Sequence, residues 1–502
     1  MDKILLGIDI GTSACKVVAF RPDGSVVGQT NADYPVYYPQ PGYVEQNAEE
    51  WYAAVCKAIH NLIDGGMNPA EVVGIGIDGQ SWSAIAVDKD CNTLANTPIW
   101  MDTRAQDICD ELKSTLGMES RLFETSGNPL QPMYTLPKVL WYKKHTPEVY
   151  ENAYKILQSN GYIGAKLTGA MTQDPSQGYG WNCYQMQEGD WDLQLCEELG
   201  IRTDLLPEIK ACHEVIGTLT AQASAETGLP VGVPVVAGGL DAACGTLGVG
   251  VLNPGETQEQ GGQAGGMSIC TSFAAAEPTL ILGAHVVPDR WLLQGGTVGG
   301  GGVMRWFEQE FGTDDRISGE EKGINQLMAM NLFADEVPAG SDGLVFLPYM
   351  SGERSPIWNA KAKGVYYGID FTKTRAHFAR ASMEGVAYSL RHNLEVAAEA
   401  GAPVEVLRAM GGAANSRTWM QIKADITGKK VVVPSADTAT ALGAAILAGV
   451  GTGIYASFEQ AVEMTIKIQK EYTPNPDNAA VYQEGYEVYR ELYENLKETM
   501  ER

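Results

Sequence analysis

A short valine-rich segment that runs into two glycines and an aspartate places the strongest constraint on how this chain folds. Residues 233–237 are apolar and too few for a helix, so they predict a buried strand. Gly238 and Gly239 break that strand, and the small residues after Asp241 predict a closely packed helix. Side chains at such strand ends reach the crevice where α/β proteins bind ligands. Asp241 can therefore accept a proton from a substrate hydroxyl, or it can simply cap the helix.

Strand–turn–helix units of this kind recur along the chain, which has room for more than one domain. Its 502 residues are more than a single hydrophobic core ordinarily organises. A composition of 44% hydrophobic and 20% charged residues is typical of a globular protein. We therefore predict two α/β domains with a deep ligand cleft between them.

The net charge indicates which classes of binding partner the chain can have. A formal net charge of -26 predicts that the chain binds neither nucleic acid nor a membrane, because both would be repelled. The negative charge of a phosphate ligand would have to be compensated within its binding site, by backbone N–H groups and Mg²⁺. The nine cysteines include no Cys-x-x-Cys pair, which favours reduced thiols over a disulfide framework or a zinc site. With no signal peptide pattern and no apolar run near 18 residues, we expect a cytoplasmic protein.

The first phosphate-binding candidate lies near the N-terminus. An apolar strand over residues 3–10 carries Asp9, and a turn of three small residues, with Lys16 on the next strand, follows: Gly11, Thr12 and Ser13. The N–H groups and hydroxyls of such a turn can wrap a phosphate chain, and Asp9 can hold Mg²⁺ through water. An ordinary hairpin with an Asx-type turn is the alternative.

Two further segments offer groups for a polar substrate. The strand over residues 72–78 ends at Gln80, Ser81 and Trp82. Downstream, Trp100, Asp102 and Arg104 combine an apolar platform with charges that can bind hydroxyls. A surface Asp–Arg pair beside a half-buried tryptophan would explain the second segment equally well.

Glycine-rich turns also mark the second half of the chain. Three of them carry the candidate nucleotide contacts, namely Gly262 and Gln263, then Gly300, and then Gly411, Gly412, Ala413 and Asn415. Glycines at strand ends let the backbone approach phosphates or a flat base. Plain loops and a strand–helix turn capped by Ser416 are the alternatives.

Two longer stretches resemble the signatures of the FGGY carbohydrate kinases. Residues 133–145 (MYTLPKVLWYKKH) are similar to the first signature, and residues 364–369 with 377–384 are similar to the second. The resemblance covers essentially the whole chain and is greatest to the xylulokinase type.

This resemblance implies the two-domain actin-like sugar kinase fold, related to ribonuclease H, and transfer of the ATP γ-phosphate to a sugar hydroxyl with Mg²⁺. It implies that Asp241 is the catalytic base and that Asp9 and Asp241 face the metal through water. The expected parts are a sugar-binding and catalytic-base domain over residues 1–250, a nucleotide-binding domain over 251–455, and a helical packing segment over 456–502, with a homodimer as one option.

Two positions depart from the family pattern. Gln263 stands where relatives usually have the threonine of a Gly-Thr-Ser turn, and Trp82 stands where xylulokinases have a substrate-contacting histidine. D-Xylulose, giving D-xylulose 5-phosphate, is nevertheless the expected substrate. The alternatives are gluconate, a polyol such as erythritol or glycerol, another ketose, or a non-enzymatic actin-like ATPase.

Overall fold

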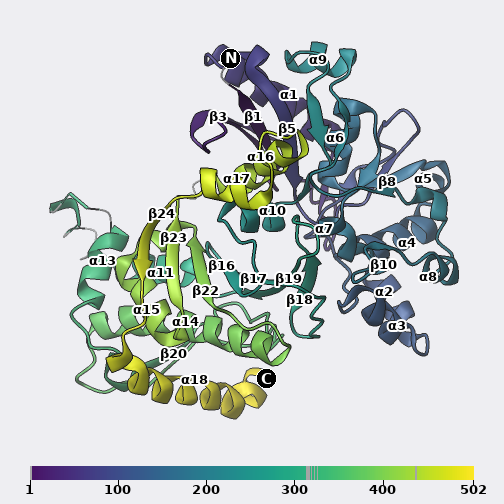
Figure 1. The fold of residues 1–502 in the computed structure, drawn as a ribbon. Helices are drawn as coiled ribbons and strands as arrows, with labels where there is room; N and C mark the ends of the chain where they lie inside the picture. The colour runs from purple at the N-terminus through teal and green to yellow at the C-terminus, as the bar shows by residue number, and fades with distance from the viewer. Residues whose placement is uncertain (1–2, 313–316, 318, 322, 325, 436–437) are drawn as a thin grey trace.

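The computed structural model describes residues 3–312, 317, 319–321, 323–324, 326–435 and 438–502, and it shows two α/β units (Figure 1). Each unit is built on a seven-stranded sheet. We call the unit that contains the N-terminal strand the first unit and the other the second unit. The predicted two-domain α/β fold is confirmed.

The first sheet combines two antiparallel hairpins with a parallel core. β1 pairs with β2 antiparallel and with β5 parallel, and β14 and β15 also run parallel to β5. β1 is apolar on both faces, as a strand covered by helices on both sides must be. The strands in spatial order are β13 (Val215–Thr218), β14 (Pro234–Val236), β5 (Val72–Gly79), β1 (Ile4–Ile10), β2 (Ala14–Phe20) and β3 (Val26–Asp33), with β15 (Gly239–Leu240) beside β5.

The second sheet repeats this plan. Its first four strands in the chain form antiparallel pairs, the fifth runs parallel to the first of them, and the sixth runs parallel to the fifth. The spatial order is β18 (Ile281–Ala284), β19 (Trp291–Thr297), β17 (Gly265–Thr271), β16 (Glu256–Gly261), β22 (Val406–Met410), β23 (Lys430–Pro434) and β24 (Ile468–Tyr472). β16 and β22 therefore occupy the places that β1 and β5 hold in the first unit.

Helices and short ribbons complete the first unit. The helices are α1 (Ala48–Asp64), α2 (Gln106–Ser114), α3 (Met118–Ser126), α4 (Thr135–His145), α5 (Pro147–Asn152), α6 (Ser159–Thr168), α7 (Pro175–Gly178), α8 (Leu193–Glu198), α9 (Ala221–Thr227) and α10 (Asp241–Gly248). The ribbons pair β4 (Glu45–Gln46) with β7 (Thr97–Pro98), β6 (Ile85–Val87) with β8 (Lys155–Leu157), β9 (Thr172–Gln173) with β12 (Glu208–Ile209), and β10 (Tyr184–Gln185) with β11 (Asp190–Trp191). In the sequence, one apolar face predicts a helix from about residue 48 to 64, through Trp51, Val55, Ile59 and Leu62. α1 confirms this prediction, with Asn47 as its N-cap.

The described helices of the second half are α11 (Gly301–Phe311), α13 (Gln326–Ala334), α14 (Arg375–Glu399), α15 (Arg417–Thr427), α16 (Ala439–Gly451), α17 (Phe458–Thr465) and α18 (Ala479–Met500), with the ribbon β20 (Val345–Leu347)–β21 (Val365–Tyr367). α18 lays Tyr482, Tyr486 and Tyr489 into the core of the second unit, where the Tyr489 hydroxyl lies 2.6 Å from that of Tyr349. None of the helices in the described ranges is long and apolar enough to cross a bilayer.

One small-residue helix ties the two units together. α16 comes late in the chain yet packs against β1 and β5 of the first sheet (Figure 1). A Cβ on Gly7 would lie 1.9 Å from the Ala441 carbonyl oxygen, and one on Gly76 would lie 1.8 Å from that of Ala444. Only glycine permits such backbone contact, and the small residues over 440–448 let α16 pack this closely.

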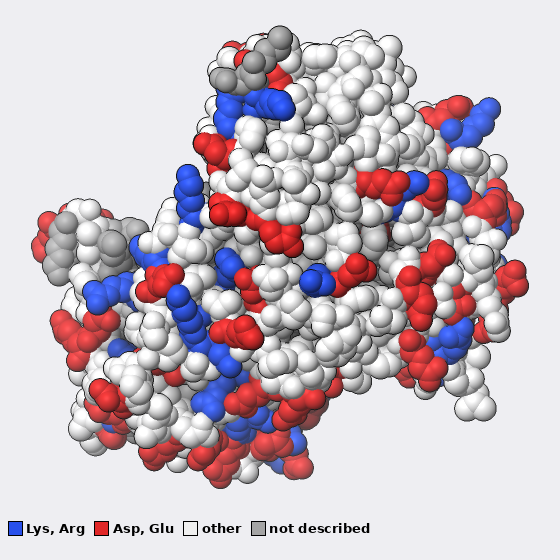
Figure 2. Space-filling model, viewed as in Figure 1, with Lys and Arg blue, Asp and Glu red and all other residues white. Residues whose placement is uncertain are grey.

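The surface carries charges of both signs despite the large net negative charge. Figure 2 shows acidic side chains gathering along the lower edge, where Figure 1 places α18 and the C-terminus.

Candidate active site

Three carboxylates meet where the parallel strands of the first sheet end. Asp9 lies in β1 directly beside Asp78 of β5, and Gly239 of β15 is the other neighbour of Asp78. Asp241 follows two residues later, as the first residue of α10. The topology thus brings Asp9 and Asp241, both predicted site residues, to the same edge of the sheet.

The position of Asp241 gives it the properties of a base. Burial raises its pKa to about 7, with the negative charge of Asp9 adding to the effect and the Ala242 N–H opposing it. That N–H donates to the Asp241 carboxylate at 2.6 Å, while Leu240 holds the N-cap position of the helix. The alternative interpretation of Asp241 as the N-cap residue is therefore not the geometry that forms.

Asp78 is the site residue that the sequence prediction missed. It is fully buried, and neither carboxylate oxygen has a hydrogen-bond donor among the described residues. Burial raises its pKa well above the ordinary value, and the charges of Asp9 and Asp241 raise it further. Burial also raises the pKa of Asp9, while its hydrogen bond with Asp78 opposes that shift. The only sequence signal for Asp78 was its place near the end of an apolar strand, which Asp9 shares.

Side chains from three other segments hold the first predicted phosphate-binding turn. The Trp100 indole N–H donates to the Thr12 hydroxyl at 3.0 Å, and the Gln46 amide donates to the Thr12 carbonyl at 2.8 Å. The Gln80 amide donates to Gln46 at 2.8 Å and lies 3.4 Å from the Gly11 carbonyl oxygen. Gln80 and Trp100, both predicted to bind substrate, are therefore neighbours of the predicted phosphate turn.

Trp82 forms an aromatic wall with two residues that the sequence prediction did not include. Its ring lies 4.7 Å from that of Tyr134 and 5.7 Å from that of Tyr179, both edge-on. The side-chain oxygen of Gln80 is buried with no partner among the described residues, whereas Trp82 shares a side-chain hydrogen bond with Tyr179. Ser81 between them is half-buried.

Asp102 and Arg104 are brought together as a buried pair. The Arg104 Nη2 lies 2.7 Å from Asp102 and 2.7 Å from Glu45, and its guanidinium stacks 4.1 Å from the Tyr43 ring centre. Asp102 has no exposed surface and also accepts the Val44 N–H. The pair is thus not the surface pair considered as an alternative. Its donors and acceptors serve each other, which favours positioning over direct contact with a hydroxyl.

The second turn joins β16 to β17 and packs on the start of α11. The Gly302 N–H donates to the Gln263 carbonyl at 2.9 Å, and a Cβ on Gly300 would lie 2.2 Å from the Ala264 carbonyl carbon. Gly262 and Gln263 line a small cavity of about 150 Å³ with Gly412 and Ala413. Three of the predicted nucleotide-binding segments therefore meet around one space.

A larger cavity of about 760 Å³ lies between the units. We call it the cleft cavity. It is lined from the first unit by Lys16, Gly24, Val26 and Gln29, and from the second by residues that include Gly411, Gly412, Asn415 and Thr438. A Cβ on Gly412 would meet no atom within 4 Å, so this glycine faces open space. The Ser416 hydroxyl caps α15 by accepting the Trp419 N–H.

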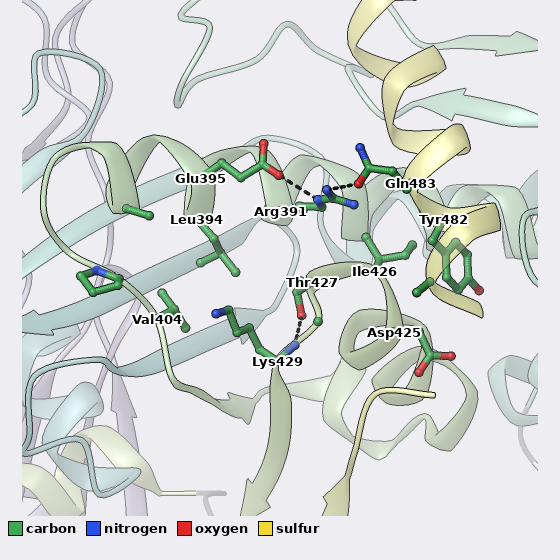
Figure 3. A pocket seen from close by; sticks show the side chains of 14 residues that line it. Arg391, Leu394, Glu395, Val404, Asp425, Ile426, Thr427, Lys429, Tyr482 and Gln483 are labelled. Atoms are coloured by element: carbon green, nitrogen blue, oxygen red, sulfur yellow. Dashed lines mark hydrogen bonds and ion pairs between the residues drawn. The ribbon is translucent and has the colours of Figure 1, made fainter. Parts of the chain in front are cut away.

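A separate pocket of about 350 Å³ lies outside this cleft, among α14, α15 and α18 (Figure 3). Its charged groups largely have internal partners, because Arg391 donates to Glu395 and Gln483 and the Asp425 carboxylate accepts from the Asn478 amide. None of the predicted site residues lines it.

The sequence matches two family models in succession. Residues 4–248 match the N-terminal domain of the FGGY family of carbohydrate kinases, and residues 268–452 match its C-terminal domain. The chain belongs to the FGGY family of carbohydrate kinases. This FGGY kinase therefore has the two-domain sugar kinase fold and is a phosphotransferase that uses ATP to phosphorylate a sugar.

Relatives with two different names align over nearly the full length of this FGGY kinase. It is 30% identical to a xylulose kinase of Bacillus subtilis, with 99% of this chain and 98% of the relative covered, and 30% identical to a gluconokinase of the same organism, with 96% and 94% covered. Among solved structures, a ligand-bound xylulose kinase and a gluconate kinase, both from Lactobacillus acidophilus, each give a TM-score of 0.89 at 26% identity over 99% of this chain and 98% of theirs.

Proposed function

We propose that this FGGY kinase phosphorylates a ketopentose, with D-xylulose giving D-xylulose 5-phosphate as the leading reaction. The observation that carries the proposal is the full-length similarity to several proteins named xylulose kinase, with identities of 29 to 32%. Asp241, at the sheet edge beside Asp9 and Asp78 and with a pKa raised to about 7, supports the reaction type.

Asp241 accepts the proton of the attacking sugar hydroxyl in the proposed mechanism. A base works best when its pKa lies near the working pH, and burial beside Asp9 supplies that shift. The Gly11–Ser13 turn and the turn that contains Gly262 and Gln263 present backbone N–H groups to the phosphates from opposite units. Gly411, Gly412, Ala413 and Asn415 accommodate the adenosine, and Lys16 lies at the same cleft cavity.

The donor set at the cleft edge fits a nucleotide-borne Mg²⁺. This ion commonly keeps several waters and contacts one or two carboxylates together with substrate phosphates. Asp9 and Asp241 are the residues that would hold it, through water. When bound, Mg²⁺ supplies charge neutralisation to the transferring phosphoryl group.

The sugar is proposed to lie among Gln80, Ser81, Trp82 and Trp100, with Asp102 and Arg104 behind it. The Gln80 oxygen supplies an acceptor that has no internal partner in the described residues. Trp82 and Trp100 also offer faces for sugar C–H groups. Closure of the two units over this space would exclude water, which competes as acceptor.

Gluconate is the second candidate, because the gluconokinase relatives cover nearly as much of the chain as the xylulose kinases do. A polyol such as erythritol or glycerol, or another ketose, would use the same machinery. A non-enzymatic actin-like ATPase does not fit membership of a carbohydrate kinase family.

The deciding experiment is a coupled ADP-release screen over ketoses, polyols and aldonates with ATP and Mg²⁺. We expect the largest kcat/KM with D-xylulose. A larger value with gluconate would replace the substrate, and ADP release that no sugar stimulates would contradict the proposed function.

Two further properties complete the proposal. We place the enzyme in the cytoplasm, supported by nine unpaired cysteines of which all but Cys56 are buried, as expected of a reducing compartment. A homodimer is proposed as one possible assembly, which light scattering after size-exclusion chromatography would test.

A further inference from the structure

Lys138 is a buried charged residue that the proposed mechanism does not use. It lies in α4, within the first family signature, and has no exposed surface. Its ammonium donates to the Trp82 carbonyl at 2.9 Å and to the Ile99 carbonyl at 2.8 Å. A lysine with no exposed surface is costly to keep, so its two acceptors need an explanation.

The two acceptors belong to the two segments proposed to bind the sugar. Trp82 is itself part of the aromatic wall, and Ile99 immediately precedes Trp100. Trp82 lies between β5 and β6, and Ile99 directly follows β7. One ammonium therefore bridges the backbones of both segments.

Other side chains on the same face of α4 hold the same segment. The Thr135 hydroxyl lies 3.3 Å from the Ser83 carbonyl oxygen, and the Tyr142 hydroxyl donates to the Ala84 carbonyl at 3.0 Å. Thr135, Lys138 and Tyr142 stand three and four residues apart, the spacing of one helix face. In addition, the Arg104 guanidinium lies 5.0 Å from the Trp141 ring centre, so α4 also supports the second segment.

The backbone at Trp82 needs such support. Its φ of 56° lies in the left-handed region, which is sparsely populated by large side chains. Such a conformation persists only where surrounding contacts determine it. The direction of the indole into the site follows from that backbone, so the bond from Lys138 to the Trp82 carbonyl acts on the position of the side chain.

We propose that Lys138 is a positioning residue for the sugar site, whose ammonium bridges the Trp82 and Ile99 carbonyls and thereby fixes the Trp82 segment relative to the Trp100 segment. The inference rests on the sugar site of the proposed function. It assigns no contact between Lys138 and the substrate.

The test is Lys138→Met in the full chain, because methionine has a similar length but no donor. We expect the KM for D-xylulose to rise about 10- to 100-fold, since small misplacements of binding groups have effects of that size. The KM for ATP should stay within about twofold, because the nucleotide groups lie on other elements. A purely structural role for Lys138 would alter both constants or neither.

Lys143→Met is the matched control, since Lys143 lies in the same helix, is exposed, and donates to the Gly200 carbonyl away from the site. It should leave both KM values unchanged. Tyr142→Phe removes a single bond to the same segment and should raise the KM for D-xylulose by a smaller factor. It also provides the test if Lys138→Met does not fold.

The outcomes separate this inference from the proposed function. An unchanged KM for D-xylulose in folded Lys138→Met, or in Tyr142→Phe if the former does not fold, would overturn the inference while wild-type turnover still supports the function. If the wild type instead turns over gluconate, the same comparison is made with gluconate. A wild-type chain that responds to no sugar would overturn both.

Discussion

At the scale of single residues, Asp241 carries the proposed chemistry. Asp241→Asn keeps the shape of the side chain but cannot accept a proton. We expect turnover to fall roughly 10²- to 10⁴-fold with ATP binding and fold nearly intact.

In the wild type, kcat/KM should rise as the pH increases through about 7, because only the deprotonated carboxylate is a base. Steady-state rates of the variant, and of the wild type across pH, measure these effects on turnover, and calorimetric titration measures ATP binding. A near-normal kcat in folded Asp241→Asn would indicate that Asp241 has only a structural role.

We expect Trp82 to influence which sugar the enzyme prefers. An indole donates one hydrogen bond and accepts none, whereas histidine can do both. Trp82→His should shift relative kcat/KM across the sugar panel towards D-xylulose, with little change in the KM for ATP. Trp358→His is the control, because Trp358 also has a left-handed backbone, with φ of 45°, but lies at an exposed position. An equal change for all sugars, or none, would make Trp82 a structural tryptophan.

At the scale of elements, the turn between β22 and α15 offers a test of the proposed nucleotide site. Gly412 borders the cleft cavity and the small cavity beside Gln263, and it faces open space. Gly412→Val should raise the KM for ATP, because the branched side chain fills that space. The sugar affinity, measured without nucleotide, should change much less. Gly412→Ala is the graded control and should have a much smaller effect. Calorimetry that finds unchanged ATP affinity in folded Gly412→Val would remove the nucleotide assignment.

At the scale of the whole molecule, a buried asparagine joins the two units. The Asn128 side chain, just after α3, donates to the Leu282 carbonyl at 2.7 Å and accepts the Leu282 N–H at 3.0 Å. Leu282 lies in β18, so these bonds attach the edge of the second sheet to the first unit. The Trp291 indole N–H adds a bond from β19 to the Met186 carbonyl.

Asn128→Ala should therefore weaken the attachment between the units. Removing both bonds leaves the buried backbone groups of Leu282 without partners, which costs about 1 to 3 kcal/mol. Urea denaturation should show this loss. Asn152→Ala, which removes a bond within the exposed helix α5, should change stability by no more than about 0.5 kcal/mol. A loss for Asn128→Ala no larger than that of Asn152→Ala would show that the attachment resides elsewhere.

Local patterns in the sequence were enough to predict the elements that carry the site. The apolar face of residues 48–64 predicted α1 to its observed ends, and the turn after Asp9 joined two strands as expected. The strand–glycine–helix context singled out Asp241 but left a base and a helix cap open, and the family resemblance then favoured the base. In each case the signal lies within a few turns or strand residues, where periodicity and turn chemistry act directly.

Contacts between distant segments decided the rest. Asp78 became part of the site only because β5 pairs with β1, and Asp102 with Arg104 became a buried pair only because Glu45 and Tyr43 close over them. Lys138 had no special signal in its own helix, since its acceptors lie in two other segments. The sequence by itself determined which local elements form and what chemistry they carry. Tertiary structure alone decided which side chains meet, because burial and pairing depend on residues far apart in the chain.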